Sequence, residues 1–423
     1  MTSRYQLFCP VCGTRFPDTY QLTCPSGCSG LIRAEYTTSQ LVIRDLPGLF
    51  RFADWLPVDG NLPTRSGPVC YKSSGLAREL GLTDLWIAFA GYWPEHNAYV
   101  TSGSFKEFEA LPTMVRLAER AEGVILVASA GNTGRAFAEV SAKTGKPVIV
   151  VVPAKARDRI WTSTPADDLL LITVDGDYTD AINLGNMICT LPGVYPEGGA
   201  KNVARRDGMG TMMLEGTVTM DHLPDWYVQA VGSGTGGIAA WEASMRLVED
   251  GRFGSHLPRL LLIQNEPFIP MANAYQAGRR EIIADDMKDP KDAISQVYAD
   301  VLTNRIPPYG ISGGVFDALT ATDGLMATAT TEEAKAAGGH FKDLEGIDLD
   351  PAAAVCVAGL IRAVQSGLMR KDENILLAIT GGGYERIHSE MKTYVHIPDL
   401  EVTQNTESKK VIQFVKEWVN RYV

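Results

Sequence analysis

Six short apolar runs recur along the chain, and most of them end in small or glycine-rich residues. The runs are 123–130 (GVILVASA), 146–153, 169–174, 226–231, 260–264 and 375–380. Segments with the spacing of amphipathic helices follow several runs, such as RAFAEVSAKTG after the first. A strand, a loop and a helix repeated in this order are typical of parallel sheets, whose strands are apolar on both faces. The pattern predicts an α/β protein with ligands at the carboxyl ends of its strands.

The spacing of these units divides the chain into four parts. We expect a short cysteine-rich segment at 1–36, a large domain formed by 37–100 and 200–395, and a small α/β domain at 101–199. A C-terminal tail with a helix is expected at 396–423. The 423 residues, 45% of them hydrophobic, are sufficient for two or three domains with cores of ordinary size.

The charge of the chain limits the class of partner that we expect, and its targeting signals limit the expected location of the protein. The chain has 39 Lys and Arg against 50 Asp and Glu, a net charge of -11, whereas nucleic-acid-binding surfaces are usually basic. We therefore expect a small-molecule ligand and no nucleic acid. The N-terminus has no apolar signal region, and no run of about 18 apolar residues occurs, so we expect a cytoplasmic protein that does not span a membrane.

Four of the seven cysteines lie close together near the N-terminus, at Cys9, Cys12, Cys24 and Cys28. Two cysteine pairs on short turns can supply four thiolates to one zinc ion, which would hold together a segment too small for a core of its own. The second pair has a three-residue spacer instead of the commoner two. A degenerate knuckle without metal is the alternative.

The segment 102–110 (SGSFKEFEA) places Lys106 behind a turn of small residues and ahead of a helix-forming run. A lysine ε-amine is the group that forms a Schiff base with pyridoxal phosphate. Taken alone, a lysine is more often a solvated surface residue. The interpretation as a cofactor-binding lysine therefore depends on the loops that could surround it.

The loop GSGTGG, after the run at 226–231, has the composition of a phosphate site. Backbone N–H groups at the start of a helix can point at an anion, and glycines allow its close approach. The ending Lys-Ser or Lys-Thr of a nucleotide P-loop is missing, so a nucleotide is less favoured, and an ordinary tight turn is the alternative. The candidate residues are Gly232, Ser233, Gly234, Thr235 and Gly236.

Two further loops carry polar residues at the ends of apolar runs. The loop SAGNTG places Asn132 and Thr133 at a helix mouth, which suits a carboxylate, although both residue types also cap helices. In the loop TGGG, Thr380 presents a hydroxyl at the tip of a strand, and a simple turn is the alternative.

In their order and spacing, the lysine segment and the three loops resemble the tryptophan-synthase-like enzymes, which have fold type II and use pyridoxal phosphate. The resemblance covers roughly residues 85–385. It implies a two-domain fold, in which Lys106 forms the internal aldimine, Asn132 bonds the phenolic oxygen of the cofactor and Thr380 bonds its pyridine nitrogen. A hydroxyl at that nitrogen favours expulsion of a β-leaving group.

The same resemblance assigns the remaining loop residues. The GSGTGG loop would hold the cofactor phosphate. The substrate carboxylate would be bound by Ser129, Ala130, Gly131 and Thr133.

Longer strings point to one branch of this family. GYWPEHNA (91–98), EGGAKNVARRDGMGT (197–211) and LTNRIPPY (302–309) resemble a paralogue of threonine synthase. The resemblance implies a β-replacement in which O-phospho-L-serine and sulfite give L-cysteate and phosphate, on a route to coenzyme M. Lys106 would remove the Cα proton and return it. Relatives self-associate, so we expect a homo-oligomer.

Both expected reactants are anions, which an acidic chain must attract through a local basic cluster. Lys201, Arg205 and Arg206 form the best candidate, and Arg135 and Lys155 are weaker ones. The alternative for the cluster is a set of solvated charges on a helix face.

Other activities remain open at this point. The SFKDR pattern common in threonine synthases is SFKEF here, with Glu107 and Phe108 in place of Asp and Arg, which disfavours O-phosphohomoserine as substrate. A phosphoserine-dependent cysteine synthase is a second alternative. A non-catalytic paralogue that binds a partner through its cysteine-rich segment is a third.

Overall fold

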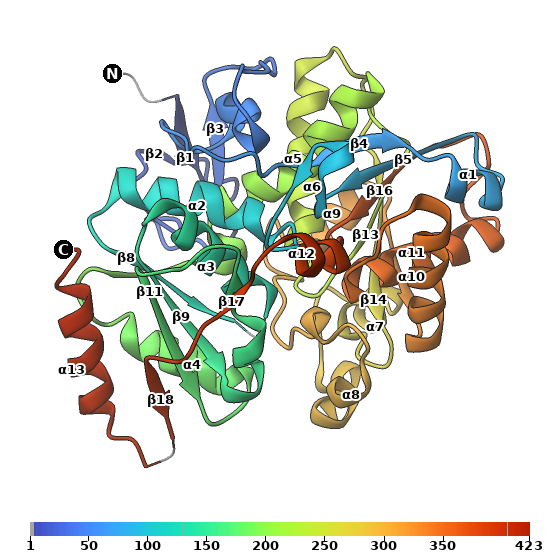
Figure 1. Cartoon of the computed structure of the whole chain (residues 1–423). Coiled ribbons are helices and arrows are strands. Elements are labelled where there is room, and N and C mark those ends of the chain that lie inside the picture. The colour runs from blue at the N-terminus through green and yellow to red at the C-terminus, as the bar shows by residue number, and fades with distance from the viewer. Residues whose placement is uncertain (1–3, 130, 404) are drawn as a thin grey trace.

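The computed structural model describes residues 4–129, 131–403 and 405–423, and two parallel-rich sheets form its frame (Figure 1). One sheet has six strands in the order β15-β14-β13-β16-β5-β4, and the other has five in the order β12-β8-β9-β11-β18. Helices pack on both faces of each sheet. The α/β architecture expected from the apolar runs is confirmed.

The six-stranded sheet is buried on both faces. Its strands are β4 (Val69–Lys72), β5 (Asp84–Phe89), β13 (Trp226–Ala230), β14 (Arg259–Asn265), β15 (Leu325–Ala329) and β16 (Asn374–Ile379). All its pairs are parallel except β4 with β5. Leu376 and Ala378 of β16 belong to one core, and Leu377 and Ile379 belong to another. This alternation explains why the strand is apolar throughout.

Helices from both halves of the chain cover this sheet. On one face lie α5 (Val203–Met220), α6 (Thr235–Asp250), α7 (Pro270–Gln276) and α9 (Val315–Ala321). On the other lie α1 (Gly75–Leu80), α10 (Thr331–Glu345) and α11 (Pro351–Gln365). The short helix α8 (Pro290–Gln296) follows α7 in the chain.

The five-stranded sheet is fully parallel. Its strands are β8 (Val124–Ala128), β9 (Val148–Pro153), β11 (Leu169–Val174), β12 (Val194–Pro196) and β18 (Leu400–Val402). Helices α2 (Lys106–Arg120) and α3 (Asn132–Thr144) cover one face, and α4 (Tyr178–Ile188) and α13 (Ser408–Val419) cover the other. Because α2 also packs against α5, one continuous core joins the two sheets.

The C-terminal residues add a strand and a helix to the smaller sheet. Strand β18 pairs in parallel with β11, and α13 lies beside this sheet (Figure 1). Val411, Val415 and Trp418 of α13 belong to the same core as the strands. The expected helix is present. The strand before it was not predicted, because its three residues, LEV, are too few to show a period.

The cysteine-rich segment forms a small antiparallel sheet in the order β2-β1-β3, made of β1 (Tyr5–Phe8), β2 (Arg15–Phe16) and β3 (Arg33–Tyr36). Its apolar cluster contains Tyr5, Leu7 and Ile32, and is completed by Val203 of α5. The apolar cluster of the segment is therefore completed by helix α5.

Short elements complete the chain. Strands β6 (Tyr92–Trp93) and β7 (Ala98–Tyr99) pair with each other, as do β10 (Trp161–Thr162) and β17 (Tyr394–Val395), and α12 (Tyr384–Glu390) follows β16. The 3-10 helices are η1 (Gly48–Trp55), η2 (Pro94–His96), η3 (Ala154–Arg159), η4 (Gly199–Lys201), η5 (Ala284–Met287) and η6 (Asp300–Leu302). Among the described residues, no helix combines the length and the hydropathy needed to cross a membrane.

Candidate active site

The turn that carries Lys106 is hydrogen-bonded to the loop after β16. The N–H of Phe105 donates to the carbonyl of Thr380 at 2.9 Å, and the N–H of Gly382 donates to the carbonyl of Gly103 at 3.1 Å. Thr380 is buried, directly after the last residue of the strand. The fold thus brings Lys106 next to Thr380, which the sequence places far apart in the chain.

Lys106 is the first residue of α2 and is mostly enclosed, with 21% of its side chain exposed. Its Nζ donates to the carboxylate of Glu109 and lies 4.6 Å from the centre of the Phe105 ring. Burial lowers the pKa of Lys106, Glu109 partly opposes this, and the nearby Arg205 guanidinium lowers the pKa further. The amine is therefore easier to deprotonate than that of a solvated surface lysine.

Asn132 begins α3, and its amide is held by Arg135 of the same helix and by the distant Asp350. Its Nδ2 donates to Asp350 at 3.2 Å, and its Oδ1 accepts from Arg135 at 2.8 Å. The Nε of Arg135 donates to the carbonyl of Ser102, at 2.8 Å, in the lysine turn. Arg135 therefore links α3 to the lysine turn, and Asn132 does not cap its helix. Arg135, a weaker candidate for the anion site, is buried and occupied by these contacts.

Ser129 takes the capping role instead. Its hydroxyl accepts from the N–H groups of Gly131 at 3.1 Å and Gly134 at 3.0 Å. Thr133 is half-buried in the first turn of α3, and Ala130 lies outside the described residues. A loop folded around the start of a helix in this way presents a positive dipole end, which suits a carboxylate.

The glycine loop joins β13 to α6 and is shaped by close backbone packing. A Cβ at Gly232 would lie 2.8 Å from the Cα of Leu302, and Gly234 has a φ of +79°. Neither position accepts a larger residue without strain. The hydroxyls of Ser233 and Thr235 lie 2.8 Å apart at the start of the helix. The loop thus presents hydroxyls beside the N-terminus of a long helix, the arrangement that binds phosphate groups.

A cavity of about 590 Å³ opens beside this loop. Its polar wall is made of Tyr178, Glu197, Lys201, Arg205, Ser233 and Thr235, and its other wall of Leu22, Leu31 and residues between Asn304 and Ile311. Cavities of this volume hold small ligands. The glycine loop and two of the three predicted basic residues therefore face one space.

The predicted basic cluster is divided by the fold. Arg205 lies in the cavity wall, 2.8 Å from Glu109, and also pairs with Glu197. Lys201 is exposed at the cavity, at the end of η4. Arg206 is fully buried and points elsewhere, because its Nε pairs with Glu242 at 2.8 Å and its other nitrogens donate to backbone carbonyls.

The prediction that Arg206 contributes to the anion site is therefore contradicted by its position. Successive residues of a helix point about 100° apart, and here Arg205 faces the cavity while Arg206 faces Glu242. Lys155, the remaining weaker candidate, is exposed on η3. The alternative of solvated helix-face charges does not apply to the two arginines, since both are buried.

Sequence reasoning missed three residues that complete the site. Glu109 lies three residues after Lys106 on the same helix, a spacing that could have identified it. Asp350 accepts from Asn132 and from the hydroxyl of Tyr384, at 3.2 Å each. Asp350 and Tyr384 had no local signal, because their partners lie on distant elements.

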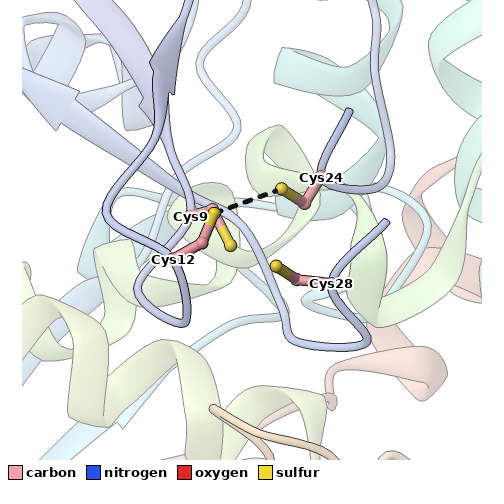
Figure 2. A group of neighbouring side chains, drawn as sticks. All are labelled: Cys9, Cys12, Cys24 and Cys28. Carbon is pink, nitrogen blue, oxygen red and sulfur yellow. Dashed lines mark hydrogen bonds between the residues drawn. The ribbon is translucent and has the colours of Figure 1, made fainter. Parts of the chain in front are cut away.

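The four clustered cysteines converge at the N-terminal segment (Figure 2). Their Sγ atoms all lie within 4.8 Å of one another, and those of Cys12 and Cys24 are 3.7 Å apart. Four sulfurs placed tetrahedrally about 2.3 Å from a zinc ion would be separated by about 3.8 Å. The donor set and its spacing therefore fit a tetrathiolate zinc site.

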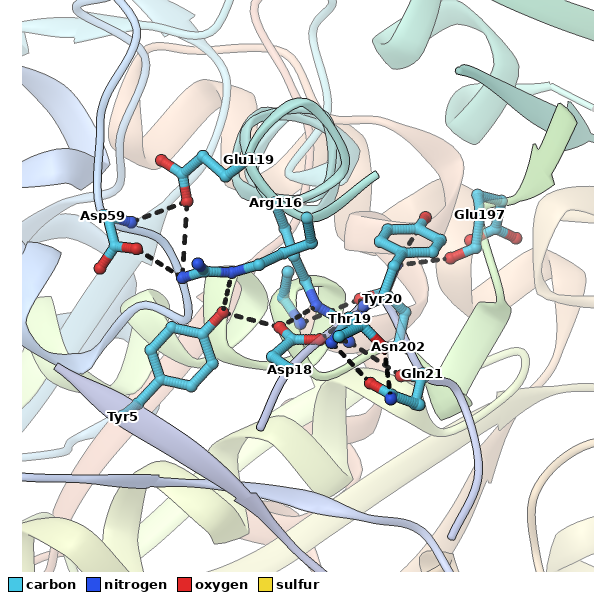
Figure 3. A network of polar contacts seen from close by, with 12 residues as sticks. Tyr5, Asp18, Thr19, Tyr20, Gln21, Asp59, Arg116, Glu119, Glu197 and Asn202 are labelled. Carbon is cyan, nitrogen blue, oxygen red and sulfur yellow. Dashed lines mark hydrogen bonds and ion pairs between the residues drawn. The ribbon is translucent and has the colours of Figure 1, made fainter. Parts of the chain in front are cut away.

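A buried polar network attaches this segment to the rest of the site (Figure 3). Arg116 of α2 pairs with Asp18 at 2.7 Å and donates to the Oδ1 of Asn202 at 2.9 Å. Asn202 caps α5 and donates to the carbonyl of Glu197 at 2.8 Å. Because the carboxylate of Glu197 pairs with Arg205, the network connects the cysteine-rich segment to the cavity wall.

The described residues fit pyridoxal phosphate. Hydroxyls at a helix N-terminus suit its phosphate, and the Lys106 amine suits its aldehyde. Asn132 lies on α3 and Thr380 in the loop after β16, the two segments hydrogen-bonded to the lysine turn. This agreement rests on the donors present and on the contacts between the loops.

Comparison with solved structures identifies the same fold. The chain is similar to a pyridoxal 5'-phosphate-dependent aspartate racemase, with a TM-score of 0.57 and 15% identity, over 76% of this chain and 92% of the other. It is also similar to maize serine racemase, with a TM-score of 0.57 and 14% identity, over 77% and 93% of the two chains. Identities this low show the fold alone.

Comparison with curated proteins gives much higher identity. The chain is 65% identical to cysteate synthase of Methanospirillum hungatei over 99% of both chains. It is 56% identical to cysteate synthase of Methanoculleus marisnigri over 95% of this chain and 94% of the relative. The family model described as "Pyridoxal-phosphate dependent enzyme" matches residues 70–381. With these matches and a site that fits the cofactor, the chain belongs to the pyridoxal-phosphate dependent enzymes, in the group of the cysteate synthases.

Proposed function

We propose that this protein converts O-phospho-L-serine and sulfite to L-cysteate and phosphate, with pyridoxal phosphate as cofactor. The observation that carries the proposal is the identity of 65% over 99% of the chain with a relative named cysteate synthase. The cavity beside the glycine loop supports it, because its wall carries the cations Lys201 and Arg205 that anionic reactants require.

The overall exchange breaks the Cβ–O bond of the substrate and forms a Cβ–S bond. Phosphate leaves with the electron pair of the broken bond, and the lone pair of the sulfite sulfur forms the new one. The bound cofactor supplies an electron sink for the charge that develops at Cα when its proton is removed. Lys106, whose pKa is lowered mainly by burial, is the base that takes this proton and returns it after the Cβ–S bond has formed.

The other loops position the cofactor and the substrate. Ser233, Thr235 and the backbone N–H groups at the start of α6 hold the cofactor phosphate, while Asn132 and Thr380 hydrogen-bond its ring. The substrate carboxylate binds at the loop from Ser129 to Thr133, where the dipole of α3 is positive. These are proposed roles, and the hydrogen bonds of the lysine turn to Arg135 of α3 and to the loop after β16 support those of Asn132 and Thr380.

Lys201 and Arg205 receive the phosphate group of the substrate or the sulfite. Arg205 is held in place by Glu109 and Glu197, so its guanidinium is already oriented when an anion arrives. Lys201 is exposed and lines the same cavity. Replacing Lys201 with Ala should therefore raise KM for O-phosphoserine more than it lowers kcat.

The reaction can be tested with the purified protein. O-phospho-L-serine is supplied with sulfite, with sulfide or with neither, and cysteate, cysteine and pyruvate are measured. Cysteate should form fastest, and Lys106→Ala should abolish both product formation and the visible absorbance of the bound cofactor. Lys410→Ala, an exposed lysine on α13, is the matched control. Cysteine or pyruvate formed faster than cysteate would disprove the substrate assignment.

We also propose a structural zinc ion at Cys9, Cys12, Cys24 and Cys28. The sulfur spacing and the small apolar cluster of this segment support it, since a segment without a sufficient core gains stability from a metal. Leu22 and Leu31, which follow the first cysteine pair in the chain, line the cavity. The ion would therefore also stabilise one wall of the substrate site.

The cellular setting is a further part of the proposal. We propose a cytoplasmic homo-oligomer that binds small anions and no nucleic acid, in agreement with the net charge of -11. Light scattering coupled to size-exclusion chromatography would determine the oligomeric state.

A further inference from the structure

Four charged side chains form a continuous row from the reactive amine to the cavity. The Nζ of Lys106 donates to Glu109, Glu109 lies 2.8 Å from Arg205, and Arg205 pairs with Glu197. The charges alternate in sign along the row. Glu109 is in the middle of it and has no exposed surface.

A carboxylate buried to this degree is costly unless cations compensate it. Glu109 has two, and they come from different helices: Lys106 lies one turn earlier on α2, and Arg205 lies on α5. Arg205 also lines the cavity. The buried carboxylate of Glu109 therefore interacts both with the amine of Lys106 and with Arg205, in the cavity wall where an anion would bind.

The charges around Lys106 act on its amine in opposite directions. Burial lowers its pKa, Glu109 and the more distant Glu197 raise it, and Arg205 lowers it. Glu107 lies on the same turn but faces Lys143 of α3, at 3.6 Å. Tyr178 of α4 and Cys189 also lie near the row, and burial raises the pKa of each, so both stay neutral.

We propose that Glu109 is a positioning residue that couples Lys106 to the binding of an anion at Arg205, an inference that rests on the function proposed above. An anion beside Arg205 competes with Glu109 for the guanidinium, and Glu109 then interacts more strongly with Lys106. The amine holds a proton better in that state. The proton taken from Cα forms an N–H bond on Lys106 as the C–H bond breaks, and it stays there, hydrogen-bonded to Glu109, until it returns to Cα.

The effects of Glu109 and Arg205 on Lys106 can be distinguished, because variants of these two residues should shift the pKa of Lys106 in opposite directions. Glu109→Gln keeps the size of the side chain but removes the charge that favours the ammonium form, so the pKa of Lys106 should fall. Arg205→Gln removes a cation that disfavours this form, so the pKa of Lys106 should rise. Damage to the fold alone would move both variants in the same direction.

The measurement is the rate at which acetic anhydride labels Lys106 in the full-length chain freed of cofactor, followed by mass spectrometry against pH. Only the unprotonated amine reacts, and one neighbouring charge changes a pKa by about 1 unit or more. At pH 8, labelling should be about tenfold faster in Glu109→Gln and several-fold slower in Arg205→Gln. Lys410, which is 75% exposed, is the internal reference in the same digest.

Two controls make the test specific. Glu107→Gln removes a buried charge from the same helical turn that faces Lys143, and should leave the labelling of Lys106 within about twofold of wild type. Inorganic phosphate at saturating concentration should slow the labelling of Lys106 in wild type and have no effect in Arg205→Gln. If Arg205→Gln does not fold, Arg205→Met, which removes the charge and fills the same buried space with an apolar side chain, replaces it in the phosphate arm.

Equal labelling in wild type and Glu109→Gln, or a shift of the same sign in both variants, would overturn the coupling. A wild-type rate that does not respond to phosphate would overturn it as well. None of these measurements depends on turnover. A protein that fails to make cysteate would disprove the proposed reaction, and the labelling results would still decide the role of Glu109.

Discussion

Replacing Asp18 with Asn tests how much the buried network contributes to the attachment of the cysteine-rich segment. Asp18 pairs with Arg116 at 2.7 Å, and the two side chains are only 3% and 0% exposed. The variant keeps the shape of the side chain and removes its charge. Arg116 would then be a buried cation that retains only neutral partners, Asn202 and the carbonyl of Gln21.

Removing one partner of a buried ion pair costs about 3 to 5 kcal/mol. Asn can still accept hydrogen bonds from Arg116 and from Tyr5, so we expect the lower end, about 3 kcal/mol. Asp59→Asn is the matched control, because Asp59 pairs with Arg120 one turn further along α2, at 2.6 Å, but is 46% exposed. An exposed pair contributes less than about 1 kcal/mol.

Urea unfolding at pH 7, followed by far-UV circular dichroism, measures both variants, and hydrogen exchange localises the loss. Asp18→Asn should lower the free energy of unfolding and increase exchange in β1 and β3. Equal losses in the two variants would refute the reasoning, since burial would then not determine the strength of the pair.

The same pair predicts a dependence on pH. Burial raises the pKa of Asp18, but the Arg116 guanidinium and the Tyr5 hydroxyl outweigh it, so the pKa is lower than usual in the folded protein. Stabilisation from a lowered carboxyl pKa is complete above the ordinary range and is lost as the pH falls through the folded value. The stability difference between wild type and Asp18→Asn should therefore shrink below about pH 4. A constant difference down to acid unfolding would contradict this assignment.

Three further predictions concern the metal, the cofactor loop and the C-terminal helix. Cys12→Ser should lose the zinc measured by atomic emission and raise KM for O-phosphoserine several-fold, while the visible absorbance of the cofactor remains. An unchanged KM would show that the metal does not stabilise the cavity wall. Gly232→Ala should weaken cofactor binding, measured by fluorescence titration, because its Cβ would lie 2.8 Å from a backbone atom of Leu302. Gly339→Ala, whose Cβ would meet no atom within 4 Å, is the control and should bind the cofactor normally. Trp418→Ala should lower the free energy of unfolding in urea by about 3 kcal/mol. Phe414, which is 36% exposed, is the control, and Phe414→Ala should lower it by well under half of that. Similar losses in the two variants would show that α13 does not pack on the sheet as described.

The sequence determined most of the strands and their class. Runs of apolar residues at 169–174 and 226–231 became β11 (Leu169–Val174) and β13 (Trp226–Ala230), because a strand buried on both faces must be apolar at every position. It also indicated where the site would lie, since glycine-rich loops after parallel strands collect at one edge of a sheet. Short or half-polar strands such as β15 (LMATA) and β18 (LEV) gave no comparable signal.

Local sequence could not decide which charges face the site. Arg205 and Arg206 are neighbours in the chain, yet one contacts Glu109 and the cavity while the other is buried against Glu242, because only the packing of α5 against α2 and α6 sets the rotation of the helix. Asp350 is another example, since its partner Asn132 lies on α3, which covers the other sheet.

The sequence by itself therefore determined the α/β class, the reactive lysine candidate and the cysteine cluster, each of which depends on residue types at short spacing. The tertiary structure decided that Glu109 would be shared by Lys106 and Arg205, and that the C-terminal residues would complete the small sheet. Both outcomes depend on contacts between segments distant in the chain, and the strength of a buried charge pair is set by the surroundings that only the folded protein supplies.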